Sequence, residues 1–136
     1  MDADAKPLPR ITQDNRPFWE ACRRHELRLP HCTACERAFW PPSPLCPHCF
    51  EPAVEWRRVS GRGTVSSFVV VHQKWFPAFA ADIPYNAVQV ELEEGPRLTS
   101  SLVGIANDEI AVGLAVEVVF DDLSEEITLP RFRPRP

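Results

Sequence analysis

The sequence predicts a mainly β protein in two parts, a small cysteine-rich ribbon followed by a barrel of short antiparallel strands. Three observations support this class. Four of the five cysteines form two Cys-x-x-Cys pairs close together, between residues 32 and 49. From residue 61 onward, apolar and polar residues alternate with the period of two that strands require. The 15 prolines concentrate at 7–9, 41–47 and 130–136, which disfavours helix in those stretches.

The composition narrows the class of protein. The 136 residues include 44% hydrophobic and 25% charged residues, the balance of a soluble globular protein. The net charge is −4, which disfavours binding to the phosphates of a nucleic acid. No apolar run approaches the ~20 residues that span a bilayer, and the acidic, proline-containing N-terminus does not resemble a secretory signal. We therefore expect a cytoplasmic protein without a membrane partner.

A short helix is predicted in the N-terminal stretch TQDNRPFWEACRRHEL. Asp14 or Asn15 can cap the start of this helix. Phe18, Trp19 and Cys22 then share one face, which indicates a packing surface. We expect Cys22 to be a small buried apolar side chain.

The four clustered cysteines have the spacing Cys32-x2-Cys35-x10-Cys46-x2-Cys49. An odd number of cysteines without an export signal argues against a disulfide framework. Two facing pairs can instead place four thiolates in a tetrahedron around Zn²⁺. Such a closed site is structural, because no coordination position is left for water or substrate. A redox dithiol and an iron site are the alternatives.

The residues around these pairs predict a rubredoxin-like zinc ribbon over residues 26–58, with three strands. Apolar and charged residues alternate on both sides of the cysteines, as in strands. Glu36 and Phe50 stand where a glycine often permits a left-handed backbone, so we expect less regular turns. His31 and His48 lie beside the cysteines and are weaker candidates as substitute ligands.

Residues 59–136 are predicted to form a five-stranded barrel of the OB type with a C-terminal tail, and residues 1–25 an N-terminal tail with the helix. The run Phe68–Val71 is typical of a strand buried on both faces. The next strand alternates, with Val88, Val90 and Leu92 expected inward. Five short strands, with glycines where a barrel bends, favour this fold.

One loop departs from the usual polar composition. Residues 72–85 include Trp75, Phe76 and Phe79. An aromatic loop is either packed inside the protein or bound to a partner or ligand. These three residues are therefore candidates for contact with a partner or a ligand. No catalytic nucleophile and base stand at a recognisable spacing, so we assign no catalytic residue.

The order of motifs resembles a known family. The stretch FWEACRRHELRLPHCTACERAFWPPSPLCPHC, followed by GRGTVSSFVVVH, PYNAVQVELEEGPRLTSSLVG and VGLAVEVVFDD, is similar to the zinc-ribbon plus OB-fold family catalogued as domain of unknown function 35. The resemblance covers residues 15–134. It implies that the four cysteines are metal ligands. It also implies an acyl-CoA-associated protein that acts as a small subunit of thiolase-like enzymes, or as a domain fused to hydratase-like folds, in lipid and aromatic-acid metabolism.

We therefore expect a non-catalytic accessory subunit that binds a thiolase-like or hydratase-like partner and helps to form its acyl-CoA site. The cofactors are then a structural Zn²⁺ and, as a shared ligand, a coenzyme A thioester. The alternative is a nucleic-acid-binding zinc-ribbon/OB module, which the exposed acidic positions Glu91 and Glu93 disfavour. An iron-containing electron carrier is a third hypothesis.

Overall fold

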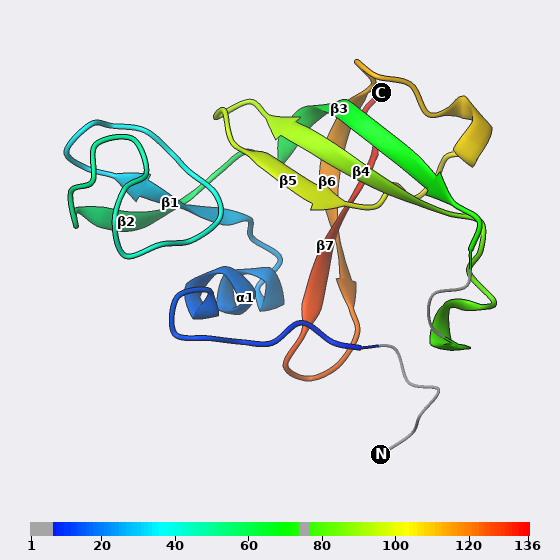
Figure 1. Cartoon of the computed structure of the whole chain (residues 1–136), viewed down its shortest axis with the longest axis horizontal. Coiled ribbons are helices and arrows are strands. Elements are labelled where there is room, and N and C mark those ends of the chain that lie inside the picture. Colours follow the sequence, from blue (N-terminus) through cyan, green and yellow to red (C-terminus); the bar gives the residue numbers. More distant parts are fainter. Residues whose placement is uncertain (1–6, 74–76) are drawn as a thin grey trace.

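The computed structural model describes residues 7–73 and 77–136. Its elements are one short α-helix, two short 3-10 helices and seven strands (Figure 1). In chain order they are α1 (Arg16–Arg23), β1 (Arg28–Cys32), β2 (Val54–Arg58), β3 (Arg62–Val71), η1 (Pro77–Phe79), β4 (Tyr85–Leu92), β5 (Arg97–Ser100), η2 (Asn107–Glu109), β6 (Ala115–Asp122) and β7 (Thr128–Pro134). No helix among the described residues is long and apolar enough to cross a membrane.

The larger sheet has five antiparallel strands in the order β5-β4-β3-β6-β7. The sheet curls, as Figure 1 shows, and its two edges approach each other after β5. There the Val103 N–H donates to the Phe132 carbonyl (2.8 Å), and the Phe132 N–H donates to the Ser101 carbonyl (3.0 Å). This curled sheet confirms the predicted mainly β class and five-stranded OB-type fold.

The ribbon contains two paired strands, not the expected three. β1 and β2 are antiparallel, from Arg28 opposite Arg58 to Cys32 opposite Val54. The third strand is reduced to a single bridge between His31 and Ala38. Prolines at positions 41, 42, 44 and 47 explain this difference, because proline lacks the N–H that a longer ladder needs.

The expectation that Phe68–Val71 is buried on both faces is wrong. β6 pairs with β3 only at Arg62–Thr64, and the register of β3 then shifts between Val65 and Ser67. The rest of β3 pairs with β4 alone, and Val69 is 58% exposed. An uninterrupted apolar run does not reveal whether other elements pack over one face of a strand or over both, so it could not distinguish these two cases.

A single apolar cluster holds the helix, the ribbon and the barrel together. The inward alternation expected for β4 is confirmed, since Val88, Val90 and Leu92 are buried. Leu27 and Leu29, from the entry to the ribbon, are buried in the same cluster as these barrel residues. The ribbon therefore packs on the barrel as part of one core. The boundaries proposed at residues 25/26 and 58/59 stay a prediction.

The start of α1 differs from expectation in one detail. Asn15 occupies the position before the helix, but its side chain makes no capping hydrogen bond. Its Oδ1 instead accepts a hydrogen bond from the Thr12 N–H (2.7 Å), in the preceding turn. Phe18 and Cys22 are buried on the inner face, as predicted.

The end of α1 is a Schellman motif with a histidine where glycine is usual. The Glu26 N–H donates to the Ala21 carbonyl (3.0 Å), and the His25 N–H donates to the Cys22 carbonyl (2.9 Å). His25 has φ of 58°, in the left-handed region that a side chain disfavours. A side chain at this position costs free energy relative to glycine, so an interaction that the imidazole makes has to offset that cost.

That interaction is a contact with the barrel. His25 Nε2 lies 2.9 Å from Asp122 Oδ1, and the imidazole stacks on Phe120 with ring centroids 5.2 Å apart. Thr128 Oγ1 donates to the same Asp122 oxygen (2.7 Å). Both interactions join the end of α1 to β6 and β7.

We predict that this contact makes stability depend on pH on the acid side. Hydrogen bonds from Thr128 and then His25 lower the pKa of Asp122. The ionised carboxylate therefore stabilises the fold above the unfolded-state pKa of about 4, and this contribution is lost as the pH falls through the lower folded-state value. The variant Asp122→Ala should melt a few degrees lower at neutral pH and show a smaller loss of stability between pH 5 and 3.

The matched control is Asp108→Ala, which removes an exposed carboxylate in η2. Melting curves of the three proteins across this pH range test the prediction. Equal acid sensitivity in the wild type and in Asp122→Ala would show that the contact contributes no pH dependence.

Candidate functional site

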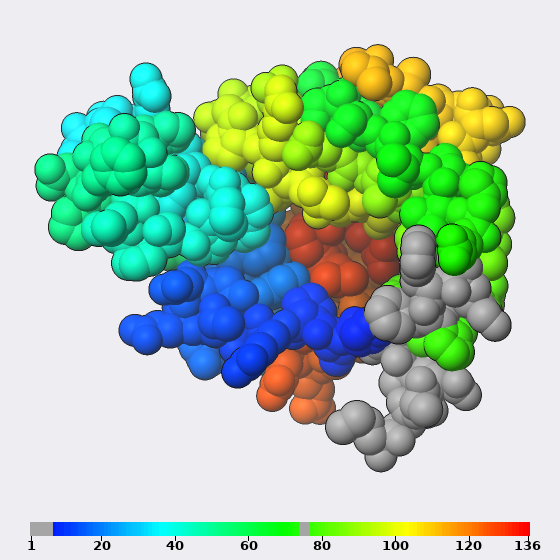
Figure 2. Space-filling model, in the orientation of Figure 1, coloured from blue at the N-terminus to red at the C-terminus, as the bar shows by residue number. Residues whose placement is uncertain are grey.

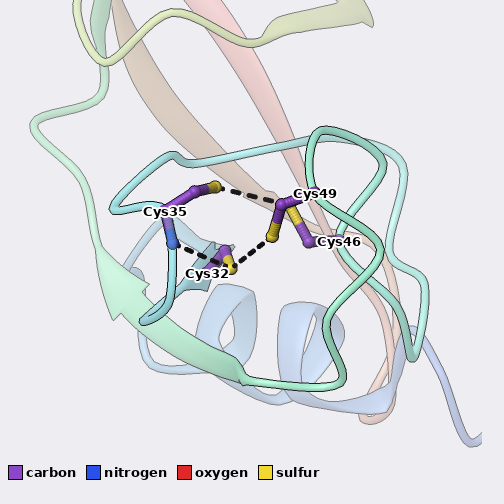
Figure 3. Close-up of side chains that lie close together, drawn as sticks. All are labelled: Cys32, Cys35, Cys46 and Cys49. Atoms are coloured by element: carbon purple, nitrogen blue, oxygen red, sulfur yellow. Dashed lines mark hydrogen bonds between the residues drawn. The ribbon is translucent and has the colours of Figure 1, made fainter.

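The two Cys-x-x-Cys turns bring four sulfur atoms together at the outer part of the ribbon (Figure 3). Cys32 ends β1, and the other three cysteines lie in the loops between β1 and β2. All four sulfurs lie within 4.8 Å of one another. The closest pairs are Cys32 with Cys49 (3.6 Å) and Cys35 with Cys46 (3.7 Å), so each pair joins one turn to the other.

The two turns have the same backbone geometry. The Glu36 N–H donates to the Cys32 carbonyl, and the Phe50 N–H donates to the Cys46 carbonyl, both at 2.8 Å. Glu36 has φ of 61° and Phe50 has φ of 64°. The expectation of less regular turns is therefore wrong, because both residues adopt the left-handed conformation without being glycine.

Backbone N–H groups point at the sulfurs of Cys32 and Cys46, whereas burial and the neighbouring thiols raise the pKa of the Cys35 thiol to about 12. The Cys35 N–H lies 3.4 Å from Cys32 Sγ, and the His48 N–H lies 3.3 Å from Cys46 Sγ. Burial by itself would raise the pKa of the Cys46 thiol, but backbone N–H groups of Cys49 and His48 lower that pKa to about 7. Metal binding requires the deprotonated form that these groups stabilise.

Cys22 provides the opposite environment within the same chain. This residue is buried among apolar side chains in the main core, as the sequence predicted. Burial raises the pKa of its thiol to about 12. Cys22 is therefore a buried packing residue that lies outside the cysteine cluster.

The geometry of the cluster fits one tetrahedral metal ion. Metal–sulfur bonds of about 2.3 Å in a tetrahedron place neighbouring sulfurs about 3.8 Å apart. The two closest pairs, at 3.6 and 3.7 Å, agree with that spacing. Cys32 and Cys46 are fully buried beside Phe39, in a small apolar cluster that excludes water. Four thiolates in such a site suit Zn²⁺.

The two histidines beside the cysteines do not join this group of ligand atoms, which consists of cysteines alone. His31 Nε2 lies 3.1 Å from Glu36 Oε2, in an interaction that links β1 to the first turn. His48 contributes its backbone N–H to the sulfur of Cys46. Both histidines therefore support the turns.

Of the three predicted partner contacts, the structure describes Phe79. Phe79 is half-buried in η1, and its ring packs against Tyr85 with centroids 5.9 Å apart. Trp75 and Phe76 lie outside the described residues. The role of these three aromatic residues in binding stays a prediction.

Two surface features emerge only in three dimensions. The first is a cleft of about 650 Å³ between the ribbon and the β4–β5 turn at residues 94–96, visible in Figure 2. Its lining includes apolar Leu29, Phe39 and Trp40 and polar Arg37, His48 and Arg57. Sequence reasoning missed this cleft because its walls come from segments far apart in the chain.

The second feature is a groove bordered by α1, β5 and β7 (Figure 2). This first hollow of about 330 Å³ shares Ser101, Leu129 and Arg131 with an adjoining hollow of about 470 Å³, which extends the groove toward residues 7–8, η1 and β4. Arg131 is held by Asp121 Oδ2 (2.8 Å) and Ser101 Oγ (2.8 Å). Apolar side chains, including Trp19 and Phe132, line most of the first hollow.

Most of the positive charge on the described surface is already paired. Nine arginine side chains lie between 2.8 and 3.9 Å from a carboxylate oxygen: Arg24, Arg28, Arg57, Arg58, Arg62, Arg97, Arg131, Arg133 and Arg135. A phosphate would have to compete with these carboxylates. The surface is therefore poorly suited to a nucleic-acid backbone.

Together, a four-cysteine ribbon and a curled five-stranded sheet on one shared core define a protein of the zinc-ribbon plus OB-fold class. Comparison with family models agrees with this class. Residues 19–55 match the ChsH2 rubredoxin-like zinc ribbon domain, and residues 56–121 match the ChsH2 C-terminal OB-fold domain. The chain belongs to the DUF35 family.

Curated relatives include subunits and scaffolds. The chain is 41% identical over 131 residues to the probable enoyl-CoA hydratase alpha subunit of Thermomonospora curvata. The match covers 95% of this chain but only 40% of that protein. It is 33% identical over 117 residues to a DUF35 domain-containing scaffold protein of Methanothermobacter thermautotrophicus, covering 85% of this chain and 87% of the relative. Thus the chain spans only part of the hydratase subunit and nearly all of the scaffold protein.

One solved structure is similar over almost its whole length. It is a chain of the Ltp2-ChsH2(DUF35) aldolase, with a TM-score of 0.85 and 40% sequence identity. The match covers 93% of this chain and 98% of that chain. The two chains therefore have the same fold over this length.

We predict that the cysteine cluster holds one structural metal ion per chain. Replacing Cys46 with Ser should abolish tight Zn²⁺ binding, and residues 33–53 should lose protection from hydrogen exchange. Leu27 and Leu29 should stay buried because they belong to the main core. Metal analysis and hydrogen exchange of the purified variant test both parts.

Cys22→Ala serves as the control, because it removes a thiol that lies outside the cluster. This variant should retain one Zn²⁺ per chain. Full metal content in Cys46→Ser would exclude the four-thiolate site. Loading with Co²⁺ provides a second readout, since thiolate ligation in a tetrahedral field gives intense visible absorption.

Proposed function

We propose that this protein is a non-catalytic accessory subunit that binds a thiolase-like or hydratase-like enzyme and helps to form its acyl-CoA site. The observation that carries the proposal is the 98% coverage of a chain of the Ltp2-ChsH2(DUF35) aldolase at a TM-score of 0.85. The relatives named as a hydratase alpha subunit and as a scaffold protein agree with a role in an assembly.

The chemistry of the described residues supports an accessory role. The one group of three or more metal-ligating side chains in the described part of the chain is the four-cysteine cluster. We propose that it holds a structural Zn²⁺, and four thiolates would leave that ion no open position for substrate. The partner subunit would then supply the catalytic residues.

The groove between α1, β5 and β7 supports the second part of the proposal. Its walls are largely apolar, and Ser101 and Arg131 place polar groups between its two hollows. Apolar walls with a few polar groups are typical of sites for small organic ligands. An acyl-CoA thioester has both an apolar chain and amide groups, which this lining can accommodate when the partner covers the groove.

Purification of the protein with candidate partners tests this function directly. We expect a stable complex when the chain is co-expressed with a thiolase-like or hydratase-like partner. Turnover of an acyl-CoA substrate should require the partner and should increase in the complex. Turnover by the isolated chain would contradict the accessory role, and tight, salt-dependent binding of single-stranded DNA would favour the nucleic-acid alternative.

We further predict that Phe79 contributes to the interface with this partner. Phe79→Ala should weaken the complex by about 2 kcal/mol, the effect of an interface hot spot, and leave the melting temperature of the isolated chain nearly unchanged. The competing view is that Phe79 only covers Tyr85 and the adjacent barrel, which predicts lower stability and unchanged affinity. Measuring both quantities on the same variant distinguishes the two roles.

A further inference from the structure

Three non-glycine residues in the described part of the chain have a left-handed backbone. They are His25, Glu36 and Phe50, with φ of 58°, 61° and 64°. The Cβ atom of an L residue crowds the following carbonyl in this conformation, so glycine is the residue that best suits these positions. A larger side chain must therefore be explained by an interaction that it makes.

For two of the three residues, the interaction lies within the chain. The imidazole of His25 contacts Asp122 at 2.9 Å and stacks on Phe120. The carboxylate of Glu36 lies 3.1 Å from His31 Nε2 and 3.6 Å from an amino group of Arg57. Replacing either residue with glycine would remove these contacts.

Phe50 differs from the other two, because its ring is directed to solvent. The residue is 74% exposed, the highest value among the large exposed hydrophobic residues of the described chain. Its backbone N–H donates to the Cys46 carbonyl, but a glycine would donate the same hydrogen bond. Neither the strained backbone nor the exposed ring is therefore offset by a contact within the described protein.

Three further exposed apolar residues, Pro44, Leu45 and Pro47, lie within six positions of Phe50 in the same loop, and we name these four residues the ribbon tip. All four are exposed, and Leu45 is 46% exposed. Residues 38–50 contain no Asp, Glu, Lys or Arg. The ribbon forms one end of the molecule, so the tip is open to a large partner (Figure 1).

We propose that the ribbon tip docks into an uncharged apolar pocket of the enzyme subunit that this protein binds, with Phe50 as the inserted anchor. The proposal rests on the accessory function proposed above. The centre of a protein interface is depleted in charged residues and enriched in aromatic ones, as the tip is. Prolines and the cysteine cluster stiffen this surface, so little conformational entropy is lost on docking.

Other occupants fit the tip less well. Surfaces that bind membranes place Lys or Arg around the apolar residues, whereas residues 38–50 have neither and the chain has a net charge of −4. A second copy would oppose two small projecting tips, which bury less area than a stable dimer needs. A concave pocket on a different subunit avoids both difficulties.

The variant Phe50→Gly tests the proposal, because its effects on stability and on binding should have opposite signs. Glycine relieves the left-handed strain, so the melting temperature of the isolated zinc-loaded chain should be unchanged or higher. The dissociation constant for the purified thiolase-like or hydratase-like subunit should rise at least tenfold. Leu45→Ser should weaken binding in the same direction without changing the backbone at Phe50.

The matched control is Glu36→Gly, which places glycine at the equivalent left-handed position of the first turn. Its affinity for the partner should equal that of the wild type. Equal affinity of Phe50→Gly and the wild type would overturn the docking role and leave the accessory function intact. A lower melting temperature of Phe50→Gly would assign the ring to internal packing and also overturn the proposal.

Three further results would contradict this inference. Loss of a concentration-dependent dimer in Phe50→Gly, measured by sedimentation, would identify a second copy as the occupant. Binding of the wild-type chain, but not of Phe50→Gly, to phosphatidylcholine vesicles would identify a lipid surface. Failure of the wild-type chain to bind either enzyme subunit would overturn the accessory function together with the proposed docking.

Discussion

The apolar cluster shared by the ribbon and the barrel is the constraint on which the rest of the structure depends. Leu27 and Leu29 are buried with barrel residues such as Val88 and Val116. Because these side chains are packed at fixed positions, the ribbon cannot rotate freely about the chain that leads into it. The cleft beside the β4–β5 turn and the orientation of the cysteine turns both follow from this packing.

Those features that depend on local spacing could be predicted from the sequence. The intervals between Cys32, Cys35, Cys46 and Cys49 are sufficient to indicate a shared ligand site, and the period of two in β4 places Val90 inward. Features that depend on distant pairing could not. The exposure of Val69 depends on what packs over that face of β3, and the cleft depends on the approach of residues 94–96 to the ribbon.

The left-handed residues show a different limit of sequence reasoning. Glycine marks such positions when the side chain has no other role, but His25 and Glu36 occupy them with side chains that bond elsewhere in the fold. Their partners are 97 and 5 residues away along the chain, so only the His31–Glu36 pair lies within a local sequence window. At His25 and Glu36, a residue other than glycine therefore indicates a side-chain contact within the fold and not an irregular turn.

The second half of β3 is an edge strand in the described structure. From Ser67 to Val71 this strand pairs with β4 alone, and residues 66–71 carry no charged side chain and no proline. Edge strands without such residues can pair with strands of other molecules. The second half of β3 is therefore the part of the sheet at which copies of this chain would pair strand to strand.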